Sequence, residues 1–275
     1  MNWCYFNGQI TALDKIKISP YDVGLLRGYG AFDMMRGFRN KPFLLKEHFD
    51  RLQSSAKALE ITLPFDFSEF KKIVAKLLEK NNYKLSAIRT VITGGISPDA
   101  FSKGVCPTCY ILIEKFIGLP KKIYERGVKI ITLNHKRQNP ELKINNYIFA
   151  IRSQTKKEKA NAFEIIYTSG GKVLEGSGSN IFLVRKNELI VTPKLDILRG
   201  CMRNFIIKNF RNKLKFSERN IKIGELRTAK EIFITGSGKG IVPVVNINGK
   251  KVSDGKIGPI TKELVKKYDE FVKSY

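Results

Sequence analysis

The chain has 275 residues, of which 43% are hydrophobic and 27% are charged. This composition is typical of a globular protein and excludes a largely disordered one. No apolar run reaches the length that crosses a membrane, and the start, MNWCYFNGQI, lacks the basic region and apolar core of a signal peptide. We therefore expect a cytoplasmic protein with no membrane partner, built as one large domain or two of ordinary size.

The charge balance is strongly basic, with 50 Lys and Arg against 25 Asp and Glu and a formal net charge of +25. Such a charge invites a nucleic-acid interpretation. The lysines are scattered, however, and no basic stripe is interleaved with aromatic residues, which argues against nucleic acid as a partner. The charge should instead draw in small anions.

Four cysteines are too few for a disulfide framework in a chain of this length. Cys106 and Cys109 have the spacing of a redox or zinc motif, but no second pair of this kind follows. The only histidines are His48 and His135. We therefore expect ordinary packing for this pair and predict no metal site.

The first part of the chain alternates strands with helices. A hairpin is expected about Asn7-Gly8, and two amphipathic helices carry apolar residues at three- and four-residue steps. The hairpin is placed at residues 3–20, and further strands are placed at 31–38, 87–94 and 109–114. The last two strands flank the loop GGISPDAFSKGV, a candidate wall or lid of a site.

The first of these helices also has a polar face. His48, Arg51 and Ser55 fall together on it by helical spacing. Two interpretations of Arg51 stay open at this point, a solvated helix residue or an anion clamp, because a guanidinium matches the geometry of a phosphate.

The stretch FIGLPKK, residues 116–122, is the best linker candidate. It divides the chain into an N-terminal α/β domain, 1–115, and a C-terminal α/β domain, 123–275. In the second domain we expect a strand at 128–133 and a helix from after Lys143 to about residue 160. The short strands that follow are separated by tight turns, which predicts an antiparallel sheet.

Two segments of the second domain suit a phosphate. A helix that begins with Gly200, Cys201 and Met202 exposes backbone amides at its positive dipole end. Ser237 lies in a Gly-Ser-Gly loop after a strand, which is a weak phosphate signal and is otherwise a plain turn.

An amine and a carboxylate stand out as candidates for chemistry. Lys143 lies in an Asn-rich turn, and Glu175 follows shortly after a Gly-Gly turn. Side chains at the ends of regular elements can meet in a site although they are distant in sequence. A lysine that is desolvated among apolar groups loses its proton more easily and can condense with a carbonyl.

Taken in order along nearly the whole chain, these motifs resemble the class IV aminotransferase family of fold-type IV pyridoxal-phosphate enzymes. The matching motifs are the glycine-rich segment Gly28 to Arg36, His48-Phe-Asp-Arg51-Leu52 with Ser55-Ala56, Lys143 to Tyr147, Glu175 to Phe182, Thr192-Pro193, Leu198 to Arg203, and Gly236-Ser237 with Pro243-Val244. The resemblance implies a two-domain α/β architecture with pyridoxal 5'-phosphate in the interdomain cleft, in a homodimer.

The resemblance also implies a role for each residue. Lys143 would form the internal Schiff base and shuttle the proton, and Glu175 would pair with the pyridine nitrogen. Tyr147 would lie near the cofactor hydroxyl. The residues that would hold the phosphate are Arg51, the backbone at Cys201 and Met202, and Ser237, and those that would contact the substrate are Arg27, Phe32 and Arg36.

The chain departs from the family pattern in three places. Cys201-Met202 stands where many members have Ile-Thr, so only backbone donors remain there, and methionine at this place also occurs in aminodeoxychorismate lyases. Arg27 replaces the usual tyrosine of branched-chain enzymes, and it would bind a substrate carboxylate or pair at the subunit interface. Asp99 and Phe101 stand where well-studied D-amino acid enzymes have an Arg-x-His carboxylate trap.

The implied reaction is ping-pong transamination between an amino acid and a 2-oxo acid such as 2-oxoglutarate. Branched-chain L-amino acids and D-amino acids are both open as substrates. The alternative reaction is 4-amino-4-deoxychorismate lyase chemistry, which needs no amino acceptor. A basic binding protein that keeps the fold without catalysis is the other class of function, and the intact Lys143 and Glu175 argue against it.

Overall fold

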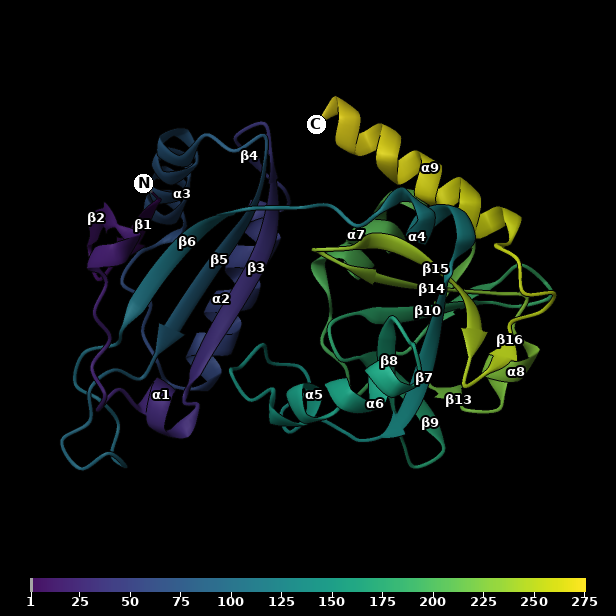
Figure 1. Cartoon of the computed structure of the whole chain (residues 1–275), viewed down its shortest axis with the longest axis horizontal. Helices are drawn as coiled ribbons and strands as arrows, with labels where there is room; N and C mark the ends of the chain where they lie inside the picture. Colours follow the sequence, from purple (N-terminus) through teal and green to yellow (C-terminus); the bar gives the residue numbers. More distant parts are fainter. Residues whose placement is uncertain (1) are drawn as a thin grey trace. The chain divides into compact units, whose positions relative to one another are not determined.

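The computed structural model describes residues 2–275, which form two compact units (Figure 1). The first consists of the described residues up to Ile117 together with Leu142–Tyr147, and the second of Gly118–Glu141 and Ile148–Tyr275. The sequence-based division placed residues 142–147 in the second domain. They group with the first unit because Ile144 forms a β-bridge to Ala31, and further backbone hydrogen bonds flank this bridge.

The first unit is built on a six-stranded antiparallel sheet in the order β2-β1-β6-β5-β3-β4. Its strands are β1 (Trp3–Phe6), β2 (Gln9–Ala12), β3 (Gly30–Phe38), β4 (Lys41–Pro42), β5 (Leu85–Thr93) and β6 (Cys109–Lys115). The expected hairpin is confirmed at β1 and β2, with Asn7 and Gly8 both at positive φ in its turn. The chain beyond β2 forms the short 3-10 turn η1 (Leu13–Lys15) instead of continuing the strand.

Two helices, α2 (Leu45–Ala58) and α3 (Phe67–Asn81), cover one face of this sheet (Figure 1), and the short α1 (Val23–Arg27) precedes β3. Both long helices were expected from their apolar stripes. Asp66 caps α3 by accepting a hydrogen bond from the amide of Glu69 (2.8 Å). The apolar faces of α2, α3, β3, β5 and β6 form one core cluster.

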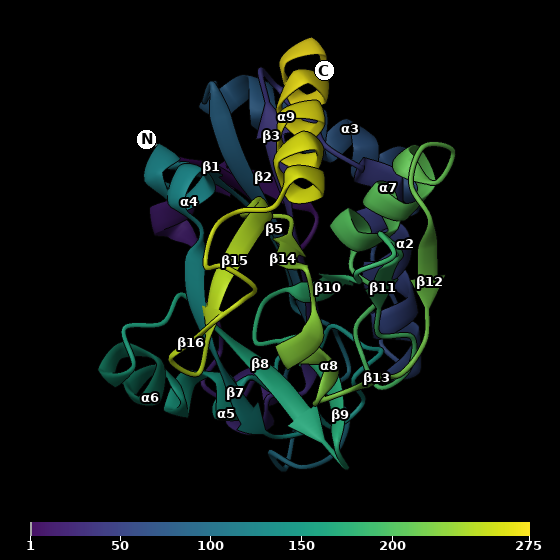
Figure 2. The ribbon, with the colours of Figure 1, turned by 90° about the vertical axis from the view of Figure 1, so that its right-hand side faces the viewer.

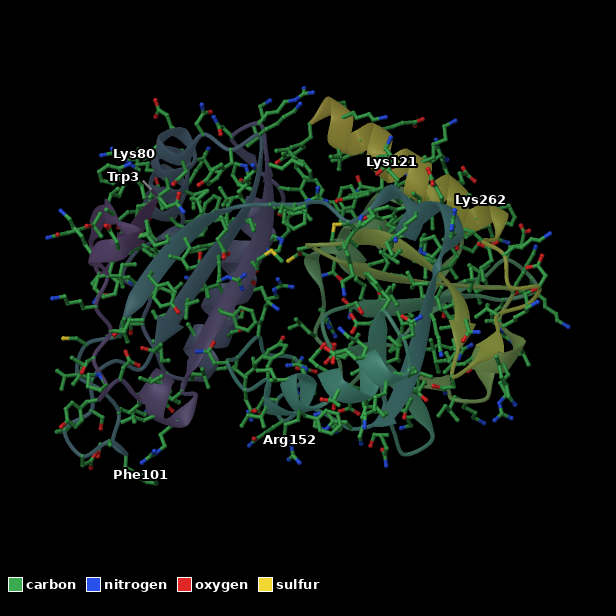
Figure 3. All side chains as sticks on the ribbon, viewed as in Figure 1. Trp3, Lys80, Phe101, Lys121, Arg152 and Lys262 are labelled. Carbon is green, nitrogen blue, oxygen red and sulfur yellow. The ribbon has the colours of Figure 1, made fainter. Side chains whose placement is uncertain are left out.

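One exposed lysine of the first unit packs against an aromatic ring. Lys80 of α3 and Trp3 of β1 lie side by side in Figure 3, with the Lys80 Nζ atom 4.2 Å from the centroid of the indole ring. This geometry is a cation–π contact. Phe101, by contrast, is 84% exposed and lies in the loop between β5 and β6.

The second unit contains a ten-stranded sheet in the order β12-β11-β10-β14-β15-β7-β8-β9-β13, with β16 paired to β15. Its strands are β7 (Val128–Asn134), β8 (Glu164–Ser169), β9 (Lys172–Gly176), β10 (Asn180–Val184), β11 (Ile190–Thr192), β12 (Phe216–Glu218), β13 (Ile221–Lys222), β14 (Glu231–Gly236), β15 (Gly240–Ile247) and β16 (Lys250–Lys251). The expected antiparallel pairing of the short strands is confirmed for β8 with β9 and for β10 with β11, while the sheet as a whole is mixed. Strand β7 runs parallel to both β8 and β15, because the long connection from β7 to β8 allows a crossover that a tight turn does not.

Six helices belong to the second unit, within residues 2–275. They are α4 (Lys121–Arg126), α5 (Ile148–Arg152), α6 (Gln154–Lys159), α7 (Cys201–Phe210), α8 (Glu225–Thr228) and α9 (Pro259–Ser274). The helix expected after Lys143 is two short helices interrupted at Ser153, and α4 occupies part of the expected linker. Figure 2 shows α9 with β14 and β15, against which it packs.

In the part of the chain that the structure describes, no helix is long and apolar enough to cross a membrane. Within the same residues, no group of three or more His, Cys, Asp and Glu side chains is arranged to hold a metal ion. Cys106 is exposed and Cys109 is buried, and both are free thiols. Cys109 is therefore a core residue, as the sequence suggested. Burial raises the pKa of its thiol, which makes the thiol a poor nucleophile.

Candidate functional site

The backbone of Lys143 is hydrogen-bonded to α2 and to β3, near the start of that strand. Its N–H donates to the Ser55 hydroxyl (3.0 Å), and its carbonyl accepts from the N–H of Phe32 (3.0 Å). The amine then lies over aromatic rings, with Nζ 4.4 Å from the ring centroid of Phe32 and 5.8 Å from that of Tyr147. A half-buried lysine with a fixed backbone and an aromatic floor is suited to react and unsuited to be a solvated surface group.

The turn around Lys143 approaches strand β3 closely. Asn145 donates its N–H to the carbonyl of Gly30 (3.0 Å), and a side chain at Gly30 would clash with the Asn145 amide and with the carbonyl of Ile92. Glycine is therefore required at this position. The glycine-rich segment thus serves to seat the lysine turn.

Arg51 lies on the same face of α2 as Ser55, one turn earlier, and is bound by a buried carboxylate. Its Nε and Nη2 atoms donate to the two oxygens of Asp33 (2.7 and 2.8 Å). Asp33 is 1% exposed and points from β3 toward α2. This fork geometry fixes the plane of the guanidinium.

His48 completes this cluster. Its Nδ1 atom lies 2.6 Å from the Asp33 oxygen, which requires Nδ1 to carry the proton, so the Arg51 Nη2 atom at 3.2 Å is a neighbour and not a partner of Nδ1. Burial would raise the pKa of Asp33, but Arg51 and His48 hold it well below its usual range. Burial is the largest influence on His48 and lowers its pKa; Asp33 raises it, Arg51 and Lys143 lower it further, and the net shift is downward. The cluster therefore contains an ionised aspartate and a neutral histidine.

A pH dependence of stability follows from His48. The unfolded histidine takes up a proton below about pH 6.5, whereas the folded one stays neutral, so the unfolded state binds more protons. We expect the free energy of unfolding to fall as the pH drops below that value, by up to about 1.4 kcal/mol per pH unit. Denaturant titrations between pH 7.5 and 5 measure this slope.

The chain offers a comparison for that measurement, because its second histidine, His135, is less buried and stacks on Phe149 at 3.7 Å between ring centroids. Burial and Arg137 lower the pKa of His135 as well, so it also contributes to the slope. His48→Gln should flatten the slope more than His135→Gln does, because His48 is the more deeply buried of the two. Equal slopes in wild type and His48→Gln contradict the assignment of a neutral buried His48.

Glu175, at the end of β9, is a second buried carboxylate. Its Oε1 atom accepts from Arg137 Nε (2.7 Å), and its Oε2 atom accepts from the N–H of Leu198 (2.9 Å). The two side chains of this ion pair are 6% and 8% exposed. A carboxylate with these two donors keeps its charge in a buried place, as a partner for a protonated ring nitrogen must.

The loop that enters α7 is bound at Leu198, whose N–H donates to Glu175 and whose carbonyl accepts from Asn180. The Asn180 amide donates to the carbonyl of Leu198 (2.7 Å), and its other side-chain atom lies against Gly200, where any side chain would clash with it. Gly200 is the N-cap of α7 and makes no side-chain cap, so Cys201 and Met202 begin the helix with their backbone amides. Glycine here brings an uncapped helix start close to the Glu175 segment.

Ser237 joins the same end of the sheet. Asn180 pairs with Thr235 across β10 and β14, and Ser237 follows two residues later in the turn to β15. Asn180 therefore contacts the loop before α7 and pairs with the strand that leads to Ser237, and Leu198 of that loop donates to Glu175. In the first unit, Lys143 lies over Tyr147 and is hydrogen-bonded to Ser55, one helical turn from Arg51.

The three predicted substrate residues have different surroundings. Phe32 lies beside Lys143 and stacks edge-on with Tyr147 (5.4 Å). Arg36, on the same face of β3, lies over the rings of Phe38 and Phe116, and its buried Nε atom has no hydrogen-bond partner. Arg27 is exposed at the end of α1, where it donates to the carbonyl of Leu26 (3.0 Å).

Sequence reasoning missed Asp33 and Arg137 as members of these networks. For Asp33 a signal existed, because it lies within the glycine-rich motif and alternates with Phe32 on β3. Arg137 gave no such signal, since its partner Glu175 lies 38 residues away in the sequence.

The chain is similar to known proteins over nearly its whole length. The model of the class IV amino-transferase family matches residues 30–247. The chain is 34% identical over 277 residues to a putative branched-chain-amino-acid aminotransferase of Methanocaldococcus jannaschii (97% of this chain, 95% of that protein). It is 29% identical over 263 residues to a D-alanine aminotransferase of Bacillus licheniformis (94% and 93% covered).

A solved structure shares the fold over the same length. The branched-chain aminotransferase of the thermophilic archaeon Thermoproteus uzoniensis, crystallised with norvaline, superposes with a TM-score of 0.89 at 26% identity, covering 98% of this chain and 94% of that one. The fold is therefore that of the fold-type IV aminotransferases, as the sequence suggested.

The chain belongs to the class IV aminotransferase family. It is an aminotransferase, and its cofactor is pyridoxal 5'-phosphate. The proteins named above are all aminotransferases, which does not favour the lyase alternative.

The residues present fit this cofactor. An amine fixed over aromatic rings suits its aldehyde, and a buried charged carboxylate suits its ring nitrogen. The uncapped start of α7, with glycine where a side chain would clash with Asn180, is a cradle for a phosphate.

Proposed function

We propose that this aminotransferase moves an amino group between a branched-chain L-amino acid or a D-amino acid and a 2-oxo acid such as 2-oxoglutarate, in a ping-pong reaction. The observation that carries the proposal is the seat of Lys143, whose fixed backbone places the amine over Phe32 and Tyr147. The names of the relatives from Methanocaldococcus jannaschii and Bacillus licheniformis support the two substrate classes.

The proposed roles follow from the chemistry of each group. Pyridoxal phosphate supplies an electron sink that stabilises a carbanion at the substrate carbon. Lys143 would hold the cofactor through its amine and, once that amine is released, would accept and return the proton of the substrate carbon. Glu175 would hold its negative charge against the ring nitrogen, and Tyr147 would lie near the ring hydroxyl.

We propose that an arginine, two backbone amides and a serine hydroxyl bind the phosphate of the cofactor. Arg51 presents a guanidinium whose plane Asp33 fixes, so little side-chain freedom is lost when it binds an anion. The amides of Cys201 and Met202 and the hydroxyl of Ser237 supply further donors. Because the N-cap residue, Gly200, has no side chain that could accept from these amides, the start of α7 suits an external anion.

For the substrate carboxylate we propose Arg36 and Arg27, with Phe32 as an apolar wall. Arg36 has the buried Nε atom without a partner, and such a donor is costly to leave unsatisfied. Arg27 is exposed, and it is either a second carboxylate contact or a contact to another subunit of a homodimer. We further propose that the enzyme acts in the cytoplasm.

The first experiment is a half-reaction on the purified enzyme loaded with pyridoxal phosphate. Panels of D- and L-amino acids are added without any 2-oxo acid, and the visible absorbance of the cofactor is followed. We expect one handedness to bleach the band and added 2-oxoglutarate to restore it, because the two half-reactions of a ping-pong enzyme are separable.

The outcomes discriminate between the candidate functions. A band that no amino acid bleaches, together with pyruvate release from aminodeoxychorismate, would replace the proposal by the lyase reaction.

In the same assay, Arg36→Gln should raise KM for the amino acid more than Arg27→Gln does. The reverse order would transfer the carboxylate contact to Arg27.

A further inference from the structure

Glu164, the first residue of β8, is a buried carboxylate that accepts four hydrogen bonds. Its Oε1 atom accepts from the Ser177 hydroxyl (2.6 Å) and the N–H of Ile165 (3.0 Å). Its Oε2 atom accepts from the Ser179 hydroxyl (2.9 Å) and Lys239 Nζ (2.6 Å). The side chain is 4% exposed. Burial would raise its pKa, but Lys239 and the serine hydroxyl hold it below its ordinary value, so the group is ionised.

These partners belong to two different turns. Ser177 and Ser179 form the turn from β9 to β10, which begins immediately after Glu175. Lys239 lies in the turn from β14 to β15, two residues after Ser237, and its backbone carbonyl accepts from the Tyr124 hydroxyl (2.9 Å). The Glu164 carboxylate therefore connects the turn that follows Glu175 to the turn that carries Ser237.

We propose that Glu164, paired with Lys239, is a positioning residue for the cofactor that sets the separation of these two turns. The inference rests on the proposed contacts of Glu175 to the ring nitrogen and of Ser237 to the phosphate. The ring nitrogen and the phosphate belong to one small molecule that spans a limited distance, so both contacts would be made together only if the two turns keep their spacing. Displacement of a binding group by about 1 Å is enough to lose much of its effect.

A further consequence concerns the two serines. Their hydroxyls donate to the buried Glu164 carboxylate, and these two hydrogen bonds fix the orientation of the β9–β10 turn. Within the EGSGSN segment, the serines thus act on the fold of the turn, and Glu175 is the member that acts on the cofactor.

The test measures the dissociation constant of pyridoxal phosphate with cofactor-stripped protein, by the absorbance change on binding. We expect Glu164→Gln and Lys239→Met each to raise it about tenfold or more, the size known for removing a supporting partner at metal sites. The double variant should be little worse than either single one, because both remove the same pair. Lys239→Arg, which keeps the charge, should restore much of the affinity.

Glu231 provides a matched control in the same sheet. It is the first residue of β14, and as a whole residue it is 3% exposed, the same fraction as Glu164. Its carboxylate accepts from the N–H groups of Ile260 (3.1 Å) and Thr261 (2.7 Å) and from the Thr261 hydroxyl (2.7 Å) at the start of α9. Glu231→Gln should lower the unfolding midpoint while leaving the dissociation constant of the cofactor unchanged.

The outcomes separate this inference from the proposed function. If Ser237→Ala and Glu175→Gln weaken cofactor binding but Glu164→Gln does not, the positioning role is wrong and the proposed contacts stand. The same conclusion holds if Glu231→Gln weakens binding as much as Glu164→Gln, because general loosening then explains both. If neither Ser237→Ala nor Glu175→Gln changes binding, the proposed contacts themselves are wrong.

Discussion

Lys143→Ala is expected to lower kcat by about 10³-fold or more, since it removes both the bond to the cofactor and the group that carries the proton. The variant should still bind pyridoxal phosphate, because the proposed phosphate and ring-nitrogen contacts are untouched. It should lack the visible band of the lysine-bound cofactor. Absorbance spectra and steady-state rates on the loaded variant measure the two effects separately.

A direct chemical readout locates the lysine among all those in the chain. Borohydride reduction of the wild-type enzyme fixes the cofactor on the lysine that holds it, and peptide mass analysis should find the label at Lys143. Lys262, exposed on α9 (Figure 3), is the control, and Lys262→Ala should keep the activity and the label. A label on another lysine, or a Lys143→Ala variant with substantial activity, contradicts the assignment.

The sequence predicted local structure better than long-range partners. Helical spacing placed His48, Arg51 and Ser55 on one face of a helix, and the structure confirms that placement: Ser55 accepts from Lys143, and Arg51 and His48 contact one carboxylate. Spacing alone could not decide whether Arg51 is solvated, because that depends on which strand lies opposite the helix. The opposing residue, Asp33, is known only once β3 packs on α2.

The strand directions in the sheet of the second unit were predicted only in part. Short strands with tight turns between them predict hairpins, and β8 with β9, β10 with β11 and β14 with β15 are indeed antiparallel neighbours. The connection from β7 to β8 is long and returns in the same direction, and periodicity carries no information on that. The same crossover holds the segment of Lys143 that joins the first unit.

The second large effect is expected at Asp33, which the sequence did not single out. Asp33→Asn leaves the Arg51 guanidinium, 12% exposed, without its counter-charge. Removing one partner of a buried ion pair costs about 3–5 kcal/mol. We expect the free energy of unfolding of the cofactor-free protein to fall by about 3 kcal/mol, as measured by denaturant titration at pH 7.5, with weaker cofactor binding because the guanidinium loses its fixed plane.

The Arg219–Glu225 pair is the matched control, since it has the same two-pronged geometry (2.9 and 2.6 Å) but side chains that are 33% and 25% exposed. Glu225→Gln should cost no more than about 1 kcal/mol, because water replaces the lost contact. If both variants lose the same free energy, burial of the Asp33–Arg51 pair is not what makes it important. If Asp33→Asn with Arg51→Gln is as unstable as the sum of the single variants, the two residues are not coupled. If the double variant loses much less free energy of unfolding than that sum, the Asp33 carboxylate stabilises the fold chiefly by compensating the positive charge of Arg51. That guanidinium is the group that we propose binds the phosphate.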